Sequence, residues 1–247
     1  MTPIETYAEE LIQELRSAGR TSNLTGMARY GIDTTHAWGT GMPVVRALAK
    51  RTKRHHELSL ILWDSGWHEA RILAALIADP LKLSRAQMDR WVQACNSWDL
   101  TDQCCMNLFW ASPYAPEAMH DWALREEEFV KRAAFATLAS LALHGKTLSD
   151  QDFIALLPLI ERGATDERNF VKKSVNWALR QIGKRSLVLH QAAVTMAEQL
   201  LKSDSRSACW IARDALRELR NEVTIGRIRA KEERSMKPKA SRAVNTV

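Results

Sequence analysis

A ten-residue pattern recurs along this chain, and its last three copies begin about 40 residues apart. The first three copies have a basic residue at the fourth position, followed by small and apolar residues. The copies that begin at Phe129 and Phe170 lie 41 residues apart, and a further copy begins at Ser207, 37 residues later. The four segments are 68–77, 129–138, 170–179 and 207–216. Self-similarity of this length, with a helix pair per unit, is typical of a HEAT-like solenoid.

Apolar residues elsewhere also recur with helical periodicity. Between Thr2 and Ala18 they occupy one helical face, with Thr2 as the expected N-cap and Pro3 at the first helical position. Strand-like alternation is almost absent, and the chain has only 10 glycines, so turns are few. We therefore predict an all-α fold, a HEAT-like helical-repeat solenoid with one concave face.

Charge separates the end of the chain from the rest. The formal net charge is +6, which permits a polyanionic partner without proving one. Much of the excess lies after Ile225, where basic residues are frequent and apolar residues are few. We predict that 1–222 forms the solenoid and that 223–247 is a flexible basic tail.

Several classes of protein are not supported by the sequence. No apolar run approaches the roughly 18 to 20 residues of a membrane span, and the first 20 residues are too charged for a signal peptide. We expect a cytoplasmic protein that does not engage membranes, with its four cysteines reduced. The seven histidines show no metal-ligand spacing, and no phosphate-binding glycine motif occurs. We therefore expect neither a metal nor another cofactor.

The most unusual short segment is 96–102, Asn-Ser-Trp-Asp-Leu-Thr-Asp. Trp98 and Asp102 are four residues apart, so on a helix they project from the same face. An aspartate is rarely buried without a partner, whereas a tryptophan favours burial. The pair therefore fits a partly open cleft. The alternative is that Trp98 anchors the core and that Asp99 or Asp102 caps the following helix.

Basic residues also recur at equivalent places in the repeat, at Arg71, Arg132 and Lys173. Each alone is adequately explained as an exposed charge or a salt-bridge partner. As a row on the inner helices, they predict a groove for phosphates. Trp177 and Arg180 lie three residues apart and share a helical face beside this row.

Five short motifs, in order and at similar spacing, resemble the AlkD-like family of HEAT-repeat DNA glycosylases, also called DNA alkylation repair proteins. The resemblance extends from about Ile4 to Leu219, and the basic tail lies outside it. The motifs are Met-Ala-Arg-Tyr at 27–30, Leu-Trp-Asp at 62–64, Ser-Trp-Asp-Leu-Thr-Asp at 97–102, Arg-Ala-Ala at 132–134 and Trp-Ala-Leu-Arg at 177–180.

The resemblance implies a role for each matching position. Asp102 takes the place of the catalytic aspartate, while Trp98 and Trp177 match the two tryptophans that cradle the damaged nucleotide. Tyr30 matches the aromatic residue that completes this cleft. Arg132 and Arg180 match residues that contact DNA beside the lesion. Arg71 and Lys173 are also expected to contact DNA, but only because they occupy the same position of the repeat as Arg132.

The implied activity is hydrolysis of the N-glycosidic bond of cationic N3- or N7-alkylated purines, such as 3-methyladenine and 7-methylguanine, in double-stranded DNA. The implied partner is alkylated DNA, and we expect a monomer because a solenoid that clamps DNA needs no second copy. One alternative is a non-catalytic HEAT-like module that binds damaged or branched DNA. Another is a protein-interaction scaffold, against which the basic row argues.

Overall fold

The computed structural model describes residues 2–146 and 148–236, which form fourteen α-helices, one short 3-10 helix and no strand. The N-terminal helices are α1 (Pro3–Ser17), α2 (Thr21–Arg29), α3 (Met42–Thr52), α4 (His56–Asp64), α5 (His68–Ile77), α6 (Arg85–Gln93) and α7 (Trp98–Asn107). After η1 (Phe109–Ala111) follow α8 (Ala115–Ala123), α9 (Glu128–His144), α10 (Asp150–Gly163), α11 (Asn169–Gly183), α12 (Leu187–Leu200), α13 (Arg206–Leu219) and α14 (Glu222–Met236). The predicted all-α class is confirmed.

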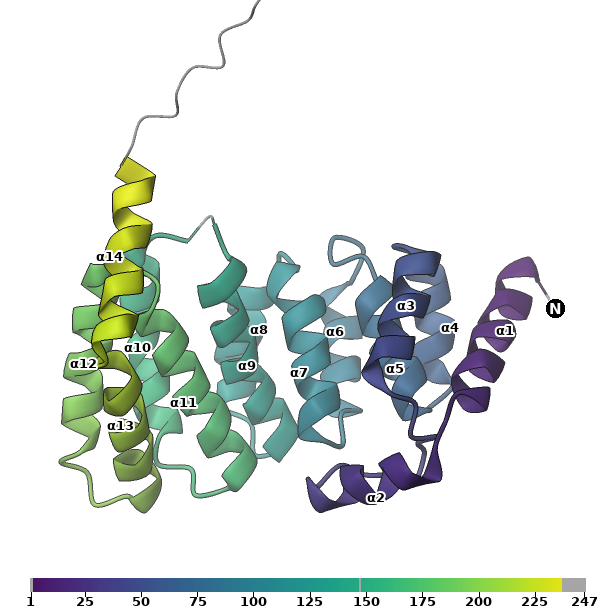
Figure 1. The fold of residues 1–247 in the computed structure, drawn as a ribbon, viewed down its shortest axis with the longest axis horizontal. Coiled ribbons are helices and arrows are strands. Elements are labelled where there is room, and N and C mark those ends of the chain that lie inside the picture. Colours follow the sequence, from purple (N-terminus) through teal and green to yellow (C-terminus); the bar gives the residue numbers. More distant parts are fainter. Residues whose placement is uncertain (1, 147, 237–247) are drawn as a thin grey trace, which may run out of the picture.

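The helices stack as a right-to-left array in Figure 1. One series consists of α3, α5, α7, α9, α11 and α13, in which each helix packs against the next. The partner helices α4, α8, α10 and α12 pack against members of this series. The four sequence repeats coincide with α5, α9, α11 and α13, and we call the series that contains them the inner series. Equivalent positions of the repeat therefore recur along one layer of the solenoid.

Side-chain caps define where several helices begin. Thr2, Ser84 and Ser149 each accept a hydrogen bond from the backbone N–H three residues later, and each forms a capping box. Helix α13 is capped by Ser205, whose side chain accepts a hydrogen bond from the N–H of Ala208. The N–H of Ser205 in turn donates to the Ser203 hydroxyl.

A continuous apolar core runs along the array between the two layers of helices. Small residues of α9, such as Ala133 and Ala136, are fully buried and allow its neighbours to approach closely. Near the N-terminal end, the indoles of Trp63 and Trp91 stack with ring centroids 4.0 Å apart. This burial gives the solenoid a rigid inner layer on which site residues can be held.

Helix α2 lies apart from the array, below α5 and α7 in Figure 1. The loop that follows α2 in the chain is held in place by Glu69, whose side chain is buried. Its carboxylate accepts hydrogen bonds from the N–H groups of Trp38, Gly39 and Thr40, at 2.7 to 3.1 Å. One carboxylate thus satisfies three backbone donors of the loop and holds the loop in place. Because the loop is attached to α2, it restricts the position of that helix.

The C-terminal segment differs from the expectation of a flexible tail. Residues Glu222–Met236 form helix α14, which packs against α13 and buries Ile228. The rest of the predicted tail, 237–247, lies outside the described residues. Among the helices that the structure describes, none combines the length and apolarity needed to cross a membrane.

Candidate active site

Helix α7 begins at Trp98 and presents both an indole and a carboxylate from its first two turns. Trp98 and Asp102 are both half-buried, on the face that points out of the core. Leu100, Thr101 and Cys104 point the other way and are fully buried. The amphipathic pattern of this short helix therefore places Trp98 and Asp102 at the surface of the inner layer.

Asp102 is held by Arg132 of α9. The Nε and Nη2 groups of Arg132 donate hydrogen bonds to the two carboxylate oxygens at 2.9 and 2.7 Å. The guanidinium is itself anchored, because Nη1 donates to the backbone oxygen of Phe170 at 2.6 Å. Burial raises the pKa of Asp102, and the charge and hydrogen bonds of Arg132 oppose this rise. A carboxylate that accepts two N–H groups from one guanidinium is stabilised in its ionised form.

Trp98 connects α7 to the end of α2. Its Nε1–H donates a hydrogen bond of 2.8 Å to the backbone oxygen of Tyr30, which ends α2. Tyr30 is 72% exposed, so its ring is available to a ligand. The Arg132 guanidinium carbon lies 5.9 Å from the centroid of the Trp98 ring. An indole, a phenol, a carboxylate and a guanidinium thus meet at one place.

Two clefts share Trp98 and Tyr30. The first, which we call the basic cleft, has a volume of about 520 Å³ and is lined by Arg29, Tyr30, Gly31, Trp98, Arg132, Asn169, Phe170 and Lys173. The second, the apolar cleft, has a volume of about 670 Å³ and extends between α2 and α7. Its lining includes Asp102, Met27, Ile32 and Met106. Asp102 therefore lies where a cationic, partly apolar ligand could reach it.

A second ion pair fixes the start of α7. The Nε2 atom of His68 and a carboxylate oxygen of Asp99 are 2.9 Å apart. Burial lowers the pKa of His68, but the hydrogen bond and charge of Asp99 outweigh this effect, so that the pKa is raised. For Asp99, burial acts to raise the pKa, but the hydrogen bond and charge of His68 have the larger effect. The pKa of Asp99 is therefore lowered. Ser97 donates to the other Asp99 oxygen at 2.7 Å. Both oxygens of Asp99 are therefore held next to Trp98, and the contact with His68 connects the start of α7 to α5.

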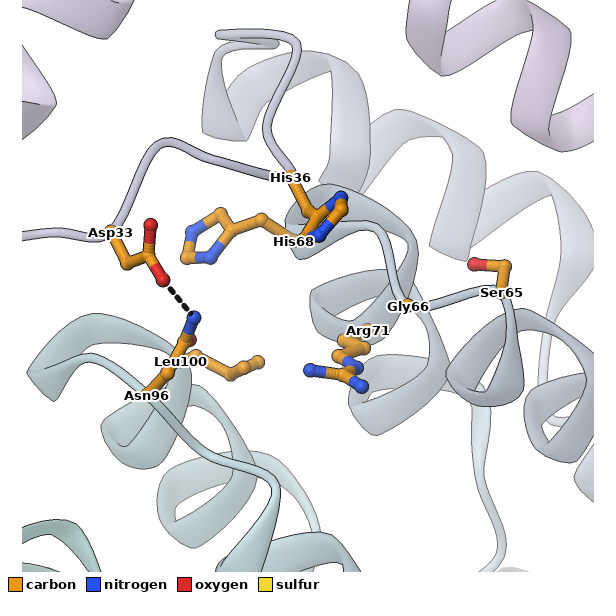
Figure 2. Close-up of a pocket in the computed structure, with 8 residues that line it drawn as sticks. All are labelled: Asp33, His36, Ser65, Gly66, His68, Arg71, Asn96 and Leu100. Carbon is orange, nitrogen blue, oxygen red and sulfur yellow. Dashed lines mark hydrogen bonds between the residues drawn. The ribbon is translucent and has the colours of Figure 1, made fainter.

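Arg71 lies in a different pocket from the other basic residues of the repeat. Figure 2 shows this polar pocket, of about 230 Å³, with Arg71, His68 and His36 around it and a hydrogen bond between Asn96 and Asp33. The Arg71 guanidinium donates to the backbone oxygens of Ala94 and Trp63 and stands over the Trp63 ring. It therefore links adjacent repeats, whereas Arg132 and Lys173 line the basic cleft.

Trp177 and Arg180 lie further along α11. Trp177 follows Lys173 by one turn and packs half-buried against the core, and it is not among the described residues that line the two clefts. Arg180 is turned toward α13, where its Nη1 donates to Glu218 at 2.6 Å and approaches Asp214 at 3.7 Å. The structure thus brings together Asp102, Trp98, Tyr30, Arg132 and Lys173, and places Arg71, Trp177 and Arg180 outside this group.

Two residues of the site were missed from the sequence. His68 holds Asp99, and Phe170 both supplies the carbonyl that anchors Arg132 and packs next to Gly31. Both stand at the first position of their repeats, a shared place that could have drawn attention to them. In the described part of the chain, no group of three or more His, Cys, Asp or Glu residues could hold a metal ion.

Comparison with known proteins identifies the family. The model of the family described as "DNA alkylation repair enzyme" matches residues 11–225. The chain belongs to this family. One solved structure, reported as "A new family of proteins related to the HEAT-like repeat DNA glycosylases with affinity for branched DNA structures", is similar with a TM-score of 0.72 and 20% identity. The similarity covers 89% of this chain and 95% of the other.

That similarity establishes the HEAT-like fold of this DNA alkylation repair family member. No curated protein was found to match the chain.

Proposed function

We propose that this protein is a DNA glycosylase that releases cationic N3- or N7-alkylated purines from double-stranded DNA. The observation that carries the proposal is the Asp102 carboxylate, held by both its oxygens beside the exposed faces of Trp98 and Tyr30. The family match supports a role in alkylation repair.

The chemistry of the lesion explains why such a simple site suffices. A purine alkylated at N3 or N7 already carries a positive charge, so it leaves without being protonated by a general acid. The enzyme must stabilise the sugar cation that develops as the N-glycosidic bond breaks, and it must orient a water molecule. A fixed carboxylate can do both. In this proposal Asp102 has these roles.

The surrounding residues favour the charged lesion over ordinary DNA. Aromatic faces attract cations, which gives Trp98 and Tyr30 a preference for an alkylated base or sugar cation. Lys173 and Arg29 line the same basic cleft and are exposed, so they can contact phosphates. Trp177 would complete the cradle if bound DNA extends one turn along α11 from Lys173.

Arg132 acts in this proposal by orienting Asp102, because the residue is only 6% exposed and each of its three guanidinium nitrogens donates to Asp102 or Phe170. Its charge and hydrogen bonds also oppose the rise that burial causes in the pKa of Asp102. Arg180, paired with Glu218, would reach DNA only if that pair opened.

The direct test is release of 7-methylguanine from a methylated duplex under single-turnover conditions. Asp102→Asn should slow release by about a hundredfold or more, while thermal unfolding and DNA binding change little. Asp64→Asn is a matched control, because it removes a carboxylate charge at the exposed end of α4. Unimpaired release by Asp102→Asn would overturn the mechanism.

A second candidate function is binding of branched DNA without catalysis. The similar solved structure, whose reported family has affinity for branched DNA, favours it. It predicts that neither the wild type nor Asp102→Asn releases base, and that both bind DNA in a salt-dependent way.

A further inference from the structure

One face of α13 carries an exposed tryptophan between arginines. Arg206, Trp210, Arg213 and Arg217 follow one another at intervals of four, three and four residues, so they project from a single helical face. All four are exposed. The opposite face, which includes Ala208, Ile211 and Ala215, is fully buried. We call the exposed row the α13 stripe.

Trp210 is an unusual residue to find on such a stripe. Its side chain is 38% exposed, although a tryptophan gains most from burial. It occupies the fourth position of the repeat, where α9 and α11 have Arg132 and Lys173. The amine of Lys172 lies 5.2 Å from its ring centroid. The indole thus lies beside the amine of Lys172 and, on its own helical face, between Arg206 and Arg213.

The charge of this surface is largely unneutralised. Arg206 and Arg213 form no ion pair with any residue that the structure describes, and the same holds for Lys172 and Lys173. The nearby acids Asp214 and Glu218 are already paired with Arg217, Arg180 and Lys184. The surface is therefore complementary to a polyanion.

The stripe continues the basic cleft. Lys173 lines that cleft together with Trp98 and Tyr30, and its neighbour Lys172 stands over Trp210. Helices α11 and α13 pack directly against each other. A DNA strand that leaves the cleft along α11 would therefore reach the α13 stripe next.

We infer that the α13 stripe binds an unpaired DNA strand next to the lesion site, with Trp210 stacking on a base and Arg206 and Arg213 contacting phosphates. This inference rests on the proposed binding of DNA by the chain. Bases inside a duplex already stack on each other, whereas a base at a fork or gap has a free face. Indole side chains stack on such bases regardless of sequence.

The test compares binding of the full chain to a forked DNA, with two unpaired arms, and to a fully paired duplex of equal length. Trp210→Ala should weaken binding to the fork about tenfold and change duplex binding less than about twofold. Trp210→Phe should retain most of the fork preference, because it keeps an aromatic face. Trp210→Leu keeps apolar cover on α13 without that face, and should behave like Trp210→Ala.

Tyr114→Ala is the matched control, since Tyr114 is equally exposed, at 38%, and lies away from α13, at the N-cap of α8. Equal weakening on fork and duplex, or none on either, would overturn the inference. So would a change in oligomeric state of Trp210→Ala in size-exclusion chromatography, because the stripe would then join copies of the chain.

Release of 7-methylguanine from intact duplex is measured on the same samples. Trp210-dependent fork binding without any base release would leave this inference standing and defeat the glycosylase proposal. Base release without any effect of Trp210→Ala on fork binding would support the glycosylase proposal and overturn this inference.

Discussion

The indole N–H of Trp98 donates a hydrogen bond to the backbone oxygen of Tyr30, 68 residues earlier in the chain. This bond joins the first turn of α7 to the C-cap residue of α2, a helix that lies apart from the array. The exposed ring of Tyr30 therefore takes its position from α7, and both clefts depend on this junction.

Gly31→Ala should disturb this junction. Gly31 has a φ of +73°, which side chains rarely adopt, and a Cβ there would lie 3.0 Å from the Phe170 ring. We expect a loss of about 1–2 kcal/mol of stability and slower release of 7-methylguanine. Urea unfolding and the release assay measure the two effects. Gly26→Ala, within α2 and with open space around it, is the matched control for stability and should leave the free energy of unfolding unchanged or raise it. Equal behaviour of the two variants would contradict this account of Gly31.

Arg132→Gln should leave Asp102 buried without its charged partner. We expect a loss of about 3 kcal/mol at neutral pH, measured by urea unfolding. Burial and, to a lesser extent, the charge of Asp99 then raise the pKa of Asp102 unopposed, so its folded-state pKa lies further above the unfolded value. A carboxyl group whose pKa is raised by folding stabilises the protein fully at pH values below its unfolded-state pKa. This contribution to the free energy of unfolding is lost as pH rises through its folded-state pKa. The deficit of Arg132→Gln should therefore shrink toward pH 4, and Arg132→Gln/Asp102→Asn should show no such dependence. A deficit independent of pH would argue against the ion pair as its cause.

His68→Gln should reveal a pH-dependent contribution of the pair with Asp99. Because the folded-state pKa of His68 is raised, its contribution is fully present below about pH 6.5 and is lost as pH rises through the folded value. The difference in Tm between wild type and variant should be larger at pH 6 than at pH 9. The exposed His120, changed to Gln, serves as control. The pKa of Asp99 is lowered, so its own contribution disappears only in strong acid.

Glu69→Gln should loosen the loop that positions α2. A glutamine keeps one acceptor oxygen but turns an amide toward backbone N–H groups, and we expect a loss of about 2 kcal/mol. Amide hydrogen exchange at Trp38, Gly39 and Thr40 should quicken before global unfolding. Glu57→Gln, at an exposed carboxylate paired with Lys82, should cost less than about 0.5 kcal/mol. Unchanged exchange at these amides would show that the loop is held by other contacts.

The sequence by itself determined the class and the layout of this protein. Apolar periodicity is set by neighbours three and four residues apart, so it identified the helices locally, and the spacing of the repeats identified the solenoid. The same local rule placed Trp98 and Asp102 on one face at the start of α7. Where the chain lacks a packed apolar face, as after Ile225, the sequence suggested a tail and the structure shows helix α14 as far as Met236.

Only the tertiary structure decided which charges are available to a ligand. Arg71, Arg132 and Lys173 occupy equivalent repeat positions, yet one bonds to backbone oxygens, one holds Asp102 and one stays exposed. Arg180 is paired by Glu218, 38 residues further on. The physical reason is that an ion pair between helices depends on distance and direction across the packed array, which the local pattern of either helix does not contain.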